Sequence, residues 1–537
     1  MNRTKIFLSS VVLIGATLVG CTKEEKIPYS EIPDMIFRDY LLVHFDTNMD
    51  GFISKEEAKA VKEIDLSNTG GAIKSLDGIQ YFTSLEILIL GYTTIESLDL
   101  SNFSRLEILD CSNNNYLEAL ILPDSKRLKS LNCSNTRLES VNLIGFEFLE
   151  DFTYNEDYRI GILNLNISNS SVKRIQCNKL IRNLNLSNLP DLEVMSIINS
   201  FLIFETGGNH TVDLSKSTKL KSLTCEYILS EINISQCTAL ETLILKNVGN
   251  KTVDLSNKTA LKYLVLSFLE NIDLDISNNR ALEILDFQCY NSKVSSFKNN
   301  TELKTLVLAL KEGETLDLSN NTLLENLYVI GNGDVNISNC KNLIDLTFFM
   351  NNIIETINIQ QYNALKNVTI LSCNNLASIN MSGSQNLDSL RISTINTGLD
   401  VDLSNCKNLR SLILDVENLN KLNASGCTTL KHFEYQPIYY NPTNWSLTSL
   451  NMSNCTSLTS ISCNYNKINE LDVSGCTALT TLSCTNNNLK ELDLYTCLAL
   501  RELNCFNNND LKTLILNKNH QITTLNKDSH TEIILKD

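Results

Sequence analysis

The sequence is poor in proline, glycine and positive charge, and these shortages narrow the kinds of protein it can encode. Of 537 residues only 6 are proline and 19 are glycine, and 20% are charged. Disordered chains and flexible linkers are rich in these residues, so we expect one continuously folded body. The 45 Lys and Arg residues are outnumbered by 61 Asp and Glu, for a net charge of −16. This balance disfavours nucleic acid and anionic lipid surfaces as partners, because both are polyanions.

Signatures of catalysis are also missing. The chain has no G-x-S-x-G, H-E-x-x-H, Walker or Rossmann motif in a fitting context. Only five histidines are present, and they are scattered along the chain: His44, His210, His432, His520 and His530. We therefore expect a protein that is not an enzyme.

The N-terminus carries an apolar run that is too short to span a membrane. It extends from Ile6 to Val19 after Arg3 and Lys5, which is the layout of a secretory signal. The following Leu18-Val-Gly-Cys21 resembles the lipobox of bacterial lipoproteins. This resemblance implies a signal peptide at residues 1–20, lipidation of Cys21 and a tether at 21–32. The alternative is a plain secreted protein with an unmodified cysteine.

The residues after Cys21 bear on the cellular location. Lys23-Glu24-Glu25 resembles the acidic export tag of lipoproteins in one group of Gram-negative anaerobes. The resemblance implies a protein held by lipid in the outer membrane and facing the cell exterior, with no transmembrane helix in the mature chain.

The dominant positive feature is a repeat with a period of 21 residues. Leu450-Asn-Met-Ser, Leu471-Asp-Val-Ser and Leu492-Asp-Leu-Tyr are spaced at this interval. Related motifs recur back to Leu98-Asp-Leu-Ser. A fixed period of this length predicts a solenoid, an architecture that typically presents long rigid surfaces for binding.

Each repeat contains two similar halves, Leu-xx-Leu-x-Cys-xx-Asn and Leu-xx-Leu-Asp-Leu-Ser-x-Cys. Both halves alternate apolar and polar residues with the period of a strand, and neither offers helical spacing. We therefore expect a mainly β solenoid of about 20 short coils, with two short parallel strands per coil on opposite walls.

A twelve-residue acidic loop precedes the repeats. It fits the EF-hand pattern, in which calcium takes hard oxygen ligands at fixed positions of the loop. Gly51 allows the sharp turn, and the expected ligands are Asp46, Asn48, Asp50, the Phe52 carbonyl, Ser54 through water, and Glu57. The alternative is a metal-free helical hairpin whose acidic loop is only solvated.

Residues 33–65 form the EF-hand-like cap in this interpretation. Ile36, Phe37, Tyr40 and Leu41 recur at helical spacing, and Ser54 with Glu57 predicts a capping box for a second helix. Only one such loop is present, so we expect a single structural Ca2+ that stabilises the cap, with a dissociation constant of roughly 10⁻⁴–10⁻³ M.

Leu479-xx-Leu-x-Cys484-xx-Asn487-x-Leu489 matches the conserved stretch of leucine-rich repeats, with cysteine in place of the third leucine. An EF-hand-like helical cap followed by short leucine-rich repeats resembles the internalin type of bacterial surface protein. The resemblance implies a repeat solenoid over residues 66–517, a C-terminal cap at 518–537, and a protein ligand bound on the repeat sheet.

The seventeen cysteines fall mainly into two repeat columns. One column is the inward strand position and the other is the turn after Ser; only Cys21 and Cys289 lie outside them. Stacked free cysteines behave as small buried hydrophobes, so we favour inert ladders. Disulfides between neighbouring coils and a metal site are the alternatives.

The outward position of the second strand is almost always Asp or Asn, and it is called the Asx column below. It includes Asp99, Asp213, Asp254, Asp275, Asp317, Asp402, Asp472 and Asp493, with Asn at the other coils. A cation-binding stripe is one interpretation. We favour side chains that bond nearby backbone N–H groups and one another, because Asn serves as well as Asp.

Two regions are candidate ligand sites. The outward column of the first strand is apolar in its middle, at Ile244, Val265, Val307 and Tyr328, with Asp286 inserted among them. Such a stripe marks a protein-binding face, or it reflects strand propensity alone. An overlong coil also places an aromatic insertion at 432–445, with Tyr435, Tyr439, Tyr440 and Trp445 as a platform for a glycan or a protein. The sequence thus predicts a surface adhesin for protein ligands, and the alternatives are a glycan-binding lipoprotein or a structural envelope protein.

Overall fold

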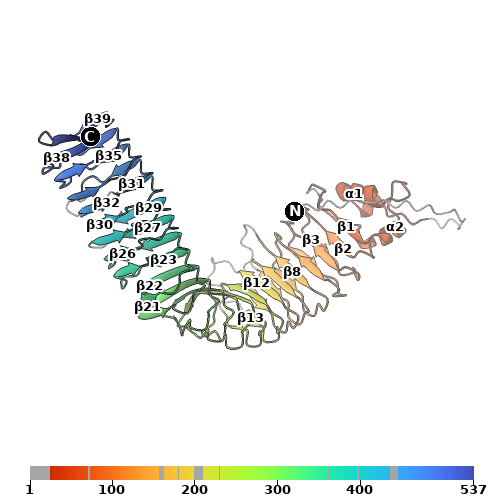
Figure 1. Ribbon diagram of the computed structural model, residues 1–537. Helices are drawn as coiled ribbons and strands as arrows, with labels where there is room; N and C mark the ends of the chain where they lie inside the picture. The colour runs from red at the N-terminus through yellow and green to blue at the C-terminus, as the bar shows by residue number, and fades with distance from the viewer. Residues whose placement is uncertain are drawn as a thin grey trace, which may run out of the picture. The chain divides into compact units, whose positions relative to one another are not determined.

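The computed structural model describes residues 24–70, 73–156, 163–178, 181–198, 210–228, 230–360, 362–395, 398–435 and 446–537. It divides into two compact units. The first comprises Met1–Glu139 with Phe146–Arg159, and the second comprises Ser140–Gly145 with Ile160–Asp537. Figure 1 shows that both are built from short strands stacked side by side.

The first unit begins with the helices of the cap and continues into coils. The helices are the 3-10 turn η1 (Tyr29–Glu31), α1 (Met35–Phe45), α2 (Lys55–Ala60) and the 3-10 turn η2 (Ile79–Tyr81). One parallel sheet, the first wall, contains β1 (Glu63–Asp65), β2 (Ile87–Ile89), β4 (Ile108–Asp110), β6 (Ser130–Asn132) and β8 (Asp151–Tyr154). The second wall pairs β3 (Ser97–Asp99) with β5 (Ala119–Ile121).

The first wall of the second unit consists of parallel strands in two sheets. The longer sheet contains β10 (Arg174–Cys177), β12 (Val194–Ile198), β14 (Ser222–Glu226), β16 (Thr242–Lys246), β17 (Tyr263–Glu270), β19 (Ile284–Tyr290), β21 (Thr305–Asp317), β22 (Asn326–Asn336), β23 (Asp345–Phe349), β25 (Asn367–Leu371), β27 (Ser389–Thr394) and β29 (Ser411–Val416). The shorter sheet contains β31 (His432–Glu434), β33 (Ser460–Ser462), β35 (Thr481–Ser483), β37 (Glu502–Asn504) and β39 (Thr524–Asn526).

The second wall of this unit is divided into shorter parallel sheets. They are β7 (Ser140–Asn142), β9 (Leu163–Asn166), β11 (Ile181–Asn185), β13 (His210–Asp213) and β15 (Ile232–Asn233); β18 (Asp273–Leu274) and β20 (Lys293–Val294); β24 (Thr356–Asn358), β26 (Ser378–Asn380), β28 (Leu399–Asp402), β30 (Leu419–Asn423), β32 (Ser449–Asn451) and β34 (Glu470–Asp472); and β36 (Glu491–Asp493), β38 (Thr513–Asn517) and β40 (Glu532–Lys536).

The prediction of a mainly β solenoid with two short parallel strands per coil is confirmed. In the described ranges, α-helix occurs only in α1 and α2. Residues 518–537, expected to form a separate C-terminal cap, instead continue both walls, because β39 pairs with β37 and β40 pairs with β38.

The core is a set of leucine rows. Leu223, Leu243, Leu264 and Leu285 pair strand to strand in register, and all four are fully buried. Each buried leucine contributes about 1.5–3 kcal/mol of transfer free energy. A shift of one residue would turn such a row outward, so the alternation that predicts the strands also fixes their register.

The turn column supplies hydrogen-bond donors to the preceding coil. The Sγ atoms of Cys406, Cys427, Cys455 and Cys476 lie 3.0–3.3 Å from carbonyl oxygens 24 to 31 residues earlier in the chain. Ser217 Oγ and Tyr362 Oη donate in the same way at other coils. The column therefore selects small buried groups that carry a donor, and a thiol is one of several that fit.

All sixteen described cysteines are buried and unbridged. Burial raises the pKa of Cys455 to about 11 and that of Cys476 to about 12. These thiols are therefore neutral donors at physiological pH, which agrees with the inert ladders expected from the sequence.

Candidate functional site

The cap is fixed to the first coil by one aspartate. Asp34 is the N-cap of α1, and its Oδ1 accepts hydrogen bonds from the N–H groups of Ile36 and Phe37 at 3.0 Å each. Its Oδ2 accepts from Lys74 N at 2.7 Å, in the chain that leads into the repeats. Burial raises the pKa of Asp34, but these backbone hydrogen bonds outweigh it and leave the pKa below its usual value. One carboxylate thus joins the helical cap to the solenoid.

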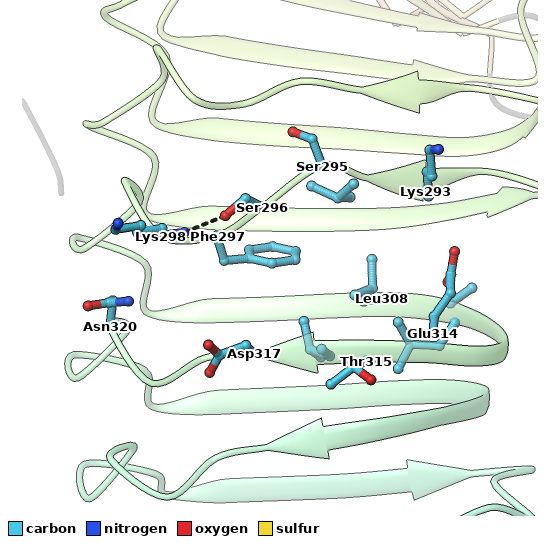
Figure 2. A pocket seen from close by; sticks show the side chains of 14 residues that line it. Lys293, Ser295, Ser296, Phe297, Lys298, Leu308, Glu314, Thr315, Asp317 and Asn320 are labelled. Atoms are coloured by element: carbon cyan, nitrogen blue, oxygen red, sulfur yellow. Dashed lines mark hydrogen bonds between the residues drawn. The ribbon is translucent and has the colours of Figure 1, made fainter.

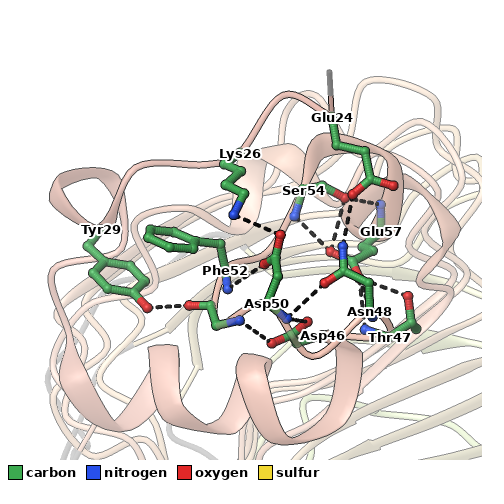
Figure 3. A network of polar contacts seen from close by, with 11 residues as sticks. Glu24, Lys26, Tyr29, Asp46, Thr47, Asn48, Asp50, Phe52, Ser54 and Glu57 are labelled. Atoms are coloured by element: carbon green, nitrogen blue, oxygen red, sulfur yellow. Dashed lines mark hydrogen bonds and ion pairs between the residues drawn. The ribbon is translucent and has the colours of Figure 1, made fainter. Parts of the chain in front are cut away.

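The acidic loop has the turn that its sequence predicts. Met49 and Gly51 have φ values of 58° and 80°. Backbone N–H groups draw the three ligand side chains inward: Asp46 Oδ2 accepts from Gly51 N at 2.9 Å, Asn48 Oδ1 from Asp50 N at 2.9 Å, and Asp50 Oδ1 from Phe52 N at 3.0 Å (Figure 3).

Glu57 joins the two ends of the loop. Its Oε2 accepts from Ser54 N at 2.9 Å in the predicted capping box, and its Oε1 accepts from Thr47 N at 2.8 Å. Burial opposes ionisation, but the hydrogen bonds from Ser54 and Thr47 hold the pKa of Glu57 below its usual value. Glu57 is therefore a carboxylate at physiological pH.

A lysine from the N-terminal segment reaches the loop. Lys26 Nζ lies 2.7 Å from Asp50 Oδ2, as Figure 3 shows, and this contact lowers the pKa of Asp50. Residues 25–27 run antiparallel to the loop, where Ile27 N donates to Ile53 O at 2.8 Å and Lys55 N donates to Glu25 O at 2.9 Å. Glu24 Oε2 also accepts from Asn48 Nδ2 at 2.9 Å.

The described part of the expected tether, residues 24–32, is therefore held against the cap. Ile27 and Ile32 are each 1% exposed, because both pack into the cap. The segment is held in place because these two apolar side chains are buried in the cap.

The donor types and the turn fit a calcium ion, but the carboxylates are not yet gathered around one point. Within the part of the chain that the structure describes, no group of three or more His, Cys, Asp or Glu side chains is placed to hold a metal. An ion on Asp46, Asn48, Asp50 and the Phe52 carbonyl would have to displace the Lys26 ammonium from Asp50. Calcium binding stays a prediction.

The second candidate site is the outward face of the first wall. Ile244, Val307 and Tyr328 are half-buried there, and Val307 pairs directly with Tyr328. Val265 belongs to the same column but is only 4% exposed, so its assignment as a ligand-contact residue is wrong. Neighbouring side chains on this crowded face cover it.

A second apolar row, which the sequence analysis missed, lies beside this column. Ala309, Ile330, Phe349 and Leu371 pair in register across β21, β22, β23 and β25, and all four are half-buried. They follow the first column by two residues, so extending the alternation by one more step would have found them. Together with Val307 and Tyr328 they form the apolar face, a name kept below for these six residues.

Charges next to the first wall neutralise one another. Lys221, Lys262 and Lys304 form ion pairs with Glu193, Glu241 and Glu283 at 3.5, 3.1 and 2.7 Å. These pairs are largely exposed to solvent, which screens them, so they add little to stability. Their alternating sign leaves the adjacent face without a strong electrostatic preference.

The Asx column behaves as the favoured interpretation predicts. Asp254, Asp275 and Asp472 each accept a hydrogen bond from the backbone N–H two residues later, at 2.9 Å. Asn233 Nδ2 donates to Asp213 Oδ1 of the preceding coil, also at 2.9 Å. The hydrogen bond from the Ser256 backbone is the largest cause of the lowered pKa of Asp254. The column is therefore engaged in stabilising turns.

A cavity of about 310 Å³ opens where the second wall is interrupted (Figure 2). Among the described residues β20 pairs only with β18, and residues 314–317 of β21 pair only with β22, so the two adjacent edges are not bonded. Lys293 and Lys298 line one side, and Glu314 and Asp317 line the other. Because both signs of charge border the opening, it favours neither anions nor cations.

The aromatic insertion lies mostly outside the described residues, as Tyr439, Tyr440 and Trp445 do. Tyr435 is described, and it is fully buried. Its hydroxyl donates to Val416 O at 3.0 Å and accepts from Leu419 N at 3.2 Å. The assignment of Tyr435 to an exposed ligand platform is therefore wrong, because its ring fills the core of its own coil.

Cys21 and the signal region also lie outside the described residues. In the described ranges the longest helix is α1, with 11 residues, and none is long and apolar enough to cross a bilayer. Lipidation and the outer-membrane location stay predictions.

Comparisons with family models and with curated proteins found no match. Among solved structures the chain is similar to the functional domain of InlJ from Listeria monocytogenes, which includes a cysteine ladder, at 18% identity and a TM-score of 0.42, over 90% of this chain and 81% of that chain. It is also similar to the internalin InlF from Listeria monocytogenes, at 18% identity and a TM-score of 0.37, over 61% and 98% of the two chains. A third similarity is to the plant peptide hormone receptor RGFR1 in complex with RGF2, at 15% identity and a TM-score of 0.42, over 90% and 91%.

At these identities and TM-scores the similarities carry no information about a partner. The fold is assigned from features of this chain alone, which are the 21-residue period, the in-register leucine rows and the helical cap before the first coil. With these features the chain has a leucine-rich repeat solenoid fold with a small helical cap.

Proposed function

We propose that this chain is a non-catalytic cell-surface lipoprotein that binds a protein ligand on the apolar face of its first wall. The single observation that carries the proposal is the contiguous pairing of Ala309, Ile330, Phe349 and Leu371 beside Val307 and Tyr328. Contiguous apolar patches on an otherwise polar surface mark protein interaction sites.

The polar residues around the apolar face support this choice. The column that contains Ile330 and Phe349 is polar in the neighbouring coils, where it carries Lys246, Ser267 and Gln288 on one side and Ser393 and Asp415 on the other. An apolar centre with a polar rim is the usual composition of a protein interface. Phe349 and Tyr328 are the expected anchors, because aromatic residues supply much of the binding energy at such sites.

The test compares one disruptive variant with one matched control. Phe349→Asp places a charge in the apolar face, and Thr224→Asp places the same charge at a half-buried outward position of β14. Both proteins are used to capture partners from host and neighbouring-cell extracts, with quantitative mass spectrometry. We expect a partner that the wild type and Thr224→Asp retain and that Phe349→Asp loses by about tenfold or more.

A partner that Phe349→Asp retains at the wild-type level would contradict the proposed face. Binding that is lost only when Tyr440 and Trp445 are substituted, with signal on a glycan array, would favour the alternative glycan-binding function. Capture of no partner by any variant would favour a structural envelope protein.

The membrane anchor is proposed from the sequence alone. The lipobox ending in Cys21 supports lipidation, and Lys23-Glu24-Glu25 supports export to the outer face. Several acyl chains hold a protein far more firmly than one. We expect Cys21→Ser to abolish incorporation of radiolabelled fatty acid and to release the protein from the outer membrane; unchanged labelling would contradict the assignment.

The acidic loop is proposed to bind one Ca2+ for stability. Asp46, Asn48, Asp50, the Phe52 carbonyl and Glu57 would hold it, with Ser54 reaching it through water. The ion supplies positive charge that gathers these oxygens, and Asp34 and Ile27 then connect the stiffened loop to the first coil and to the N-terminal segment.

A further inference from the structure

The last coil presents an unpaired strand edge. β40 is the outermost strand of the sheet β36-β38-β40 and, among the described residues, pairs only with β38. All five of its residues are exposed, with Ile533 at 41%, Ile534 at 44% and Leu535 at 56%. An exposed apolar edge strand is a template for pairing with another chain.

The hydrogen bonds to β38 show which backbone groups remain available. Glu532 N donates to Lys512 O at 2.8 Å, and Lys536 O accepts from Lys518 N at 2.9 Å. In a parallel pair every second residue directs both its N–H and its C=O to the same neighbour. Glu532, Ile534 and Lys536 therefore face β38, and the N–H and C=O groups of Ile533 and Leu535 face the free edge.

The sequence of this edge is complementary to itself. When Glu532-Ile-Ile-Leu-Lys536 is placed antiparallel to a second copy about Ile534, Glu532 lies opposite the partner's Lys536. Ile533 then lies opposite the partner's Leu535, and Ile534 opposite its own counterpart. The same register brings together the free N–H and C=O groups of Ile533 and Leu535, which form hydrogen-bonded pairs in an antiparallel ladder.

The outward column of the second wall changes from polar to apolar side chains at β38 and β40. The last residue of each of the strands β30, β32, β34 and β36 belongs to this outward column, and these residues are Asn423, Asn451, Asp472 and Asp493, respectively. In β38 and β40 the residues of this column are Ile515 and Ile534.

We propose that β40 pairs antiparallel with β40 of a second copy of this chain, in the register centred on Ile534, and so forms a two-fold symmetric dimer. A two-fold interface uses the same patch on both copies, so a self-complementary strand is what it requires. Lys536 can take part, because the one ion pair that it makes among the described residues is a long one, 3.9 Å to Asp493. This dimer is independent of the ligand face proposed above and would place two such faces in one assembly.

Charge reversal tests the register. The purified chain carrying Cys21→Ser is compared with the same chain carrying Glu532→Lys, Lys536→Glu or both, by sedimentation velocity over a wide concentration range. Each single reversal places like charges opposite each other at two symmetric positions, so we expect the dimer dissociation constant to rise about tenfold or more. The double reversal restores both opposite-charge pairs and should return the constant to near its original value. The matched control, Glu491→Lys, changes an exposed residue of the same column two coils earlier and should have no effect.

A cysteine tests the pairing directly. At a non-hydrogen-bonded antiparallel position the facing Cα atoms are about 4.5 Å apart, which a disulfide can span. Ile534→Cys should therefore cross-link two chains under mild oxidation, whereas Glu491→Cys should not. The native described cysteines are all buried and do not compete. A protein that stays monomeric at all concentrations, or a dimer that resists both single reversals, would overturn the proposal.

Discussion

Cys476 and Cys484, one from each cysteine column, should respond in opposite ways to the same pair of substitutions. Cys476 lies in the turn column, and its Sγ donates to Met452 O at 3.0 Å. Cys484 lies in the inward strand column, is fully buried, and its thiol donates to no carbonyl among the described residues. We compare Ala and Ser at both positions.

The expected magnitudes follow from these contacts. At position 476, Ala removes a buried sulfur and a donor; Met452 O keeps its hydrogen bond from Cys455 N, so the loss is about 2 kcal/mol. Ser keeps a donor there and should cost only about 0.5–1 kcal/mol. At position 484, Ala should cost about 1 kcal/mol for lost packing, but Ser buries an unpaired hydroxyl and should cost about 2–3 kcal/mol.

The assay is urea-induced unfolding followed by circular dichroism, with the free energy of unfolding taken from linear extrapolation. Ser should be the more stable variant at position 476, and Ala the more stable at 484. Ala being more stable than Ser at position 476 would refute the assignment of the turn thiol as a donor, and Ser being more stable than Ala at 484 would refute the absence of an acceptor there. Equal stability of Ala and Ser at position 476 would also refute the donor assignment.

Three further outcomes are expected. Lys26→Met should raise the affinity of the loop for calcium and Glu57→Gln should lower it, in calorimetric titration, because the first removes a competing cation and the second removes a ligand charge; identical affinities would contradict the loop assignment. The folded-state pKa values of Asp99, Asp213, Asp254, Asp275 and Asp317 are lowered, so their stabilisation is full above the unfolded pKa of about 4 and is lost as the pH falls through the folded pKa; the melting temperature should fall between pH 5 and 3, and Asp213→Asn should flatten that slope. Tyr435→Phe should reduce the free energy of unfolding by about 1–3 kcal/mol, because Val416 O and Leu419 N lose a buried partner; an unchanged urea midpoint would contradict the two buried hydrogen bonds of the hydroxyl.

The alternation of apolar and polar residues along the chain determined most of the fold. Leu-x-Leu spacing fixes both strands of each coil, and the 21-residue period fixes how successive coils pair, because a one-residue slip would expose every leucine. The EF-hand spacing likewise predicted the turn at Gly51 and the capping box of Ser54 with Glu57. These features depend on neighbours in sequence or on neighbours exactly one repeat away, so reading along the chain is enough to find them.

Tertiary structure decided which side chains are covered and what distant segments contact. Val265 and Tyr435 are buried although their positions predicted exposure, because burial depends on the sizes of side chains in adjacent coils. Lys26 reaches Asp50, and Asp34 reaches Lys74, through packing that no local pattern encodes. The unpaired edge at β40 likewise follows from which strand ends the stack, since a strand's own residues do not say whether a neighbour lies beside it.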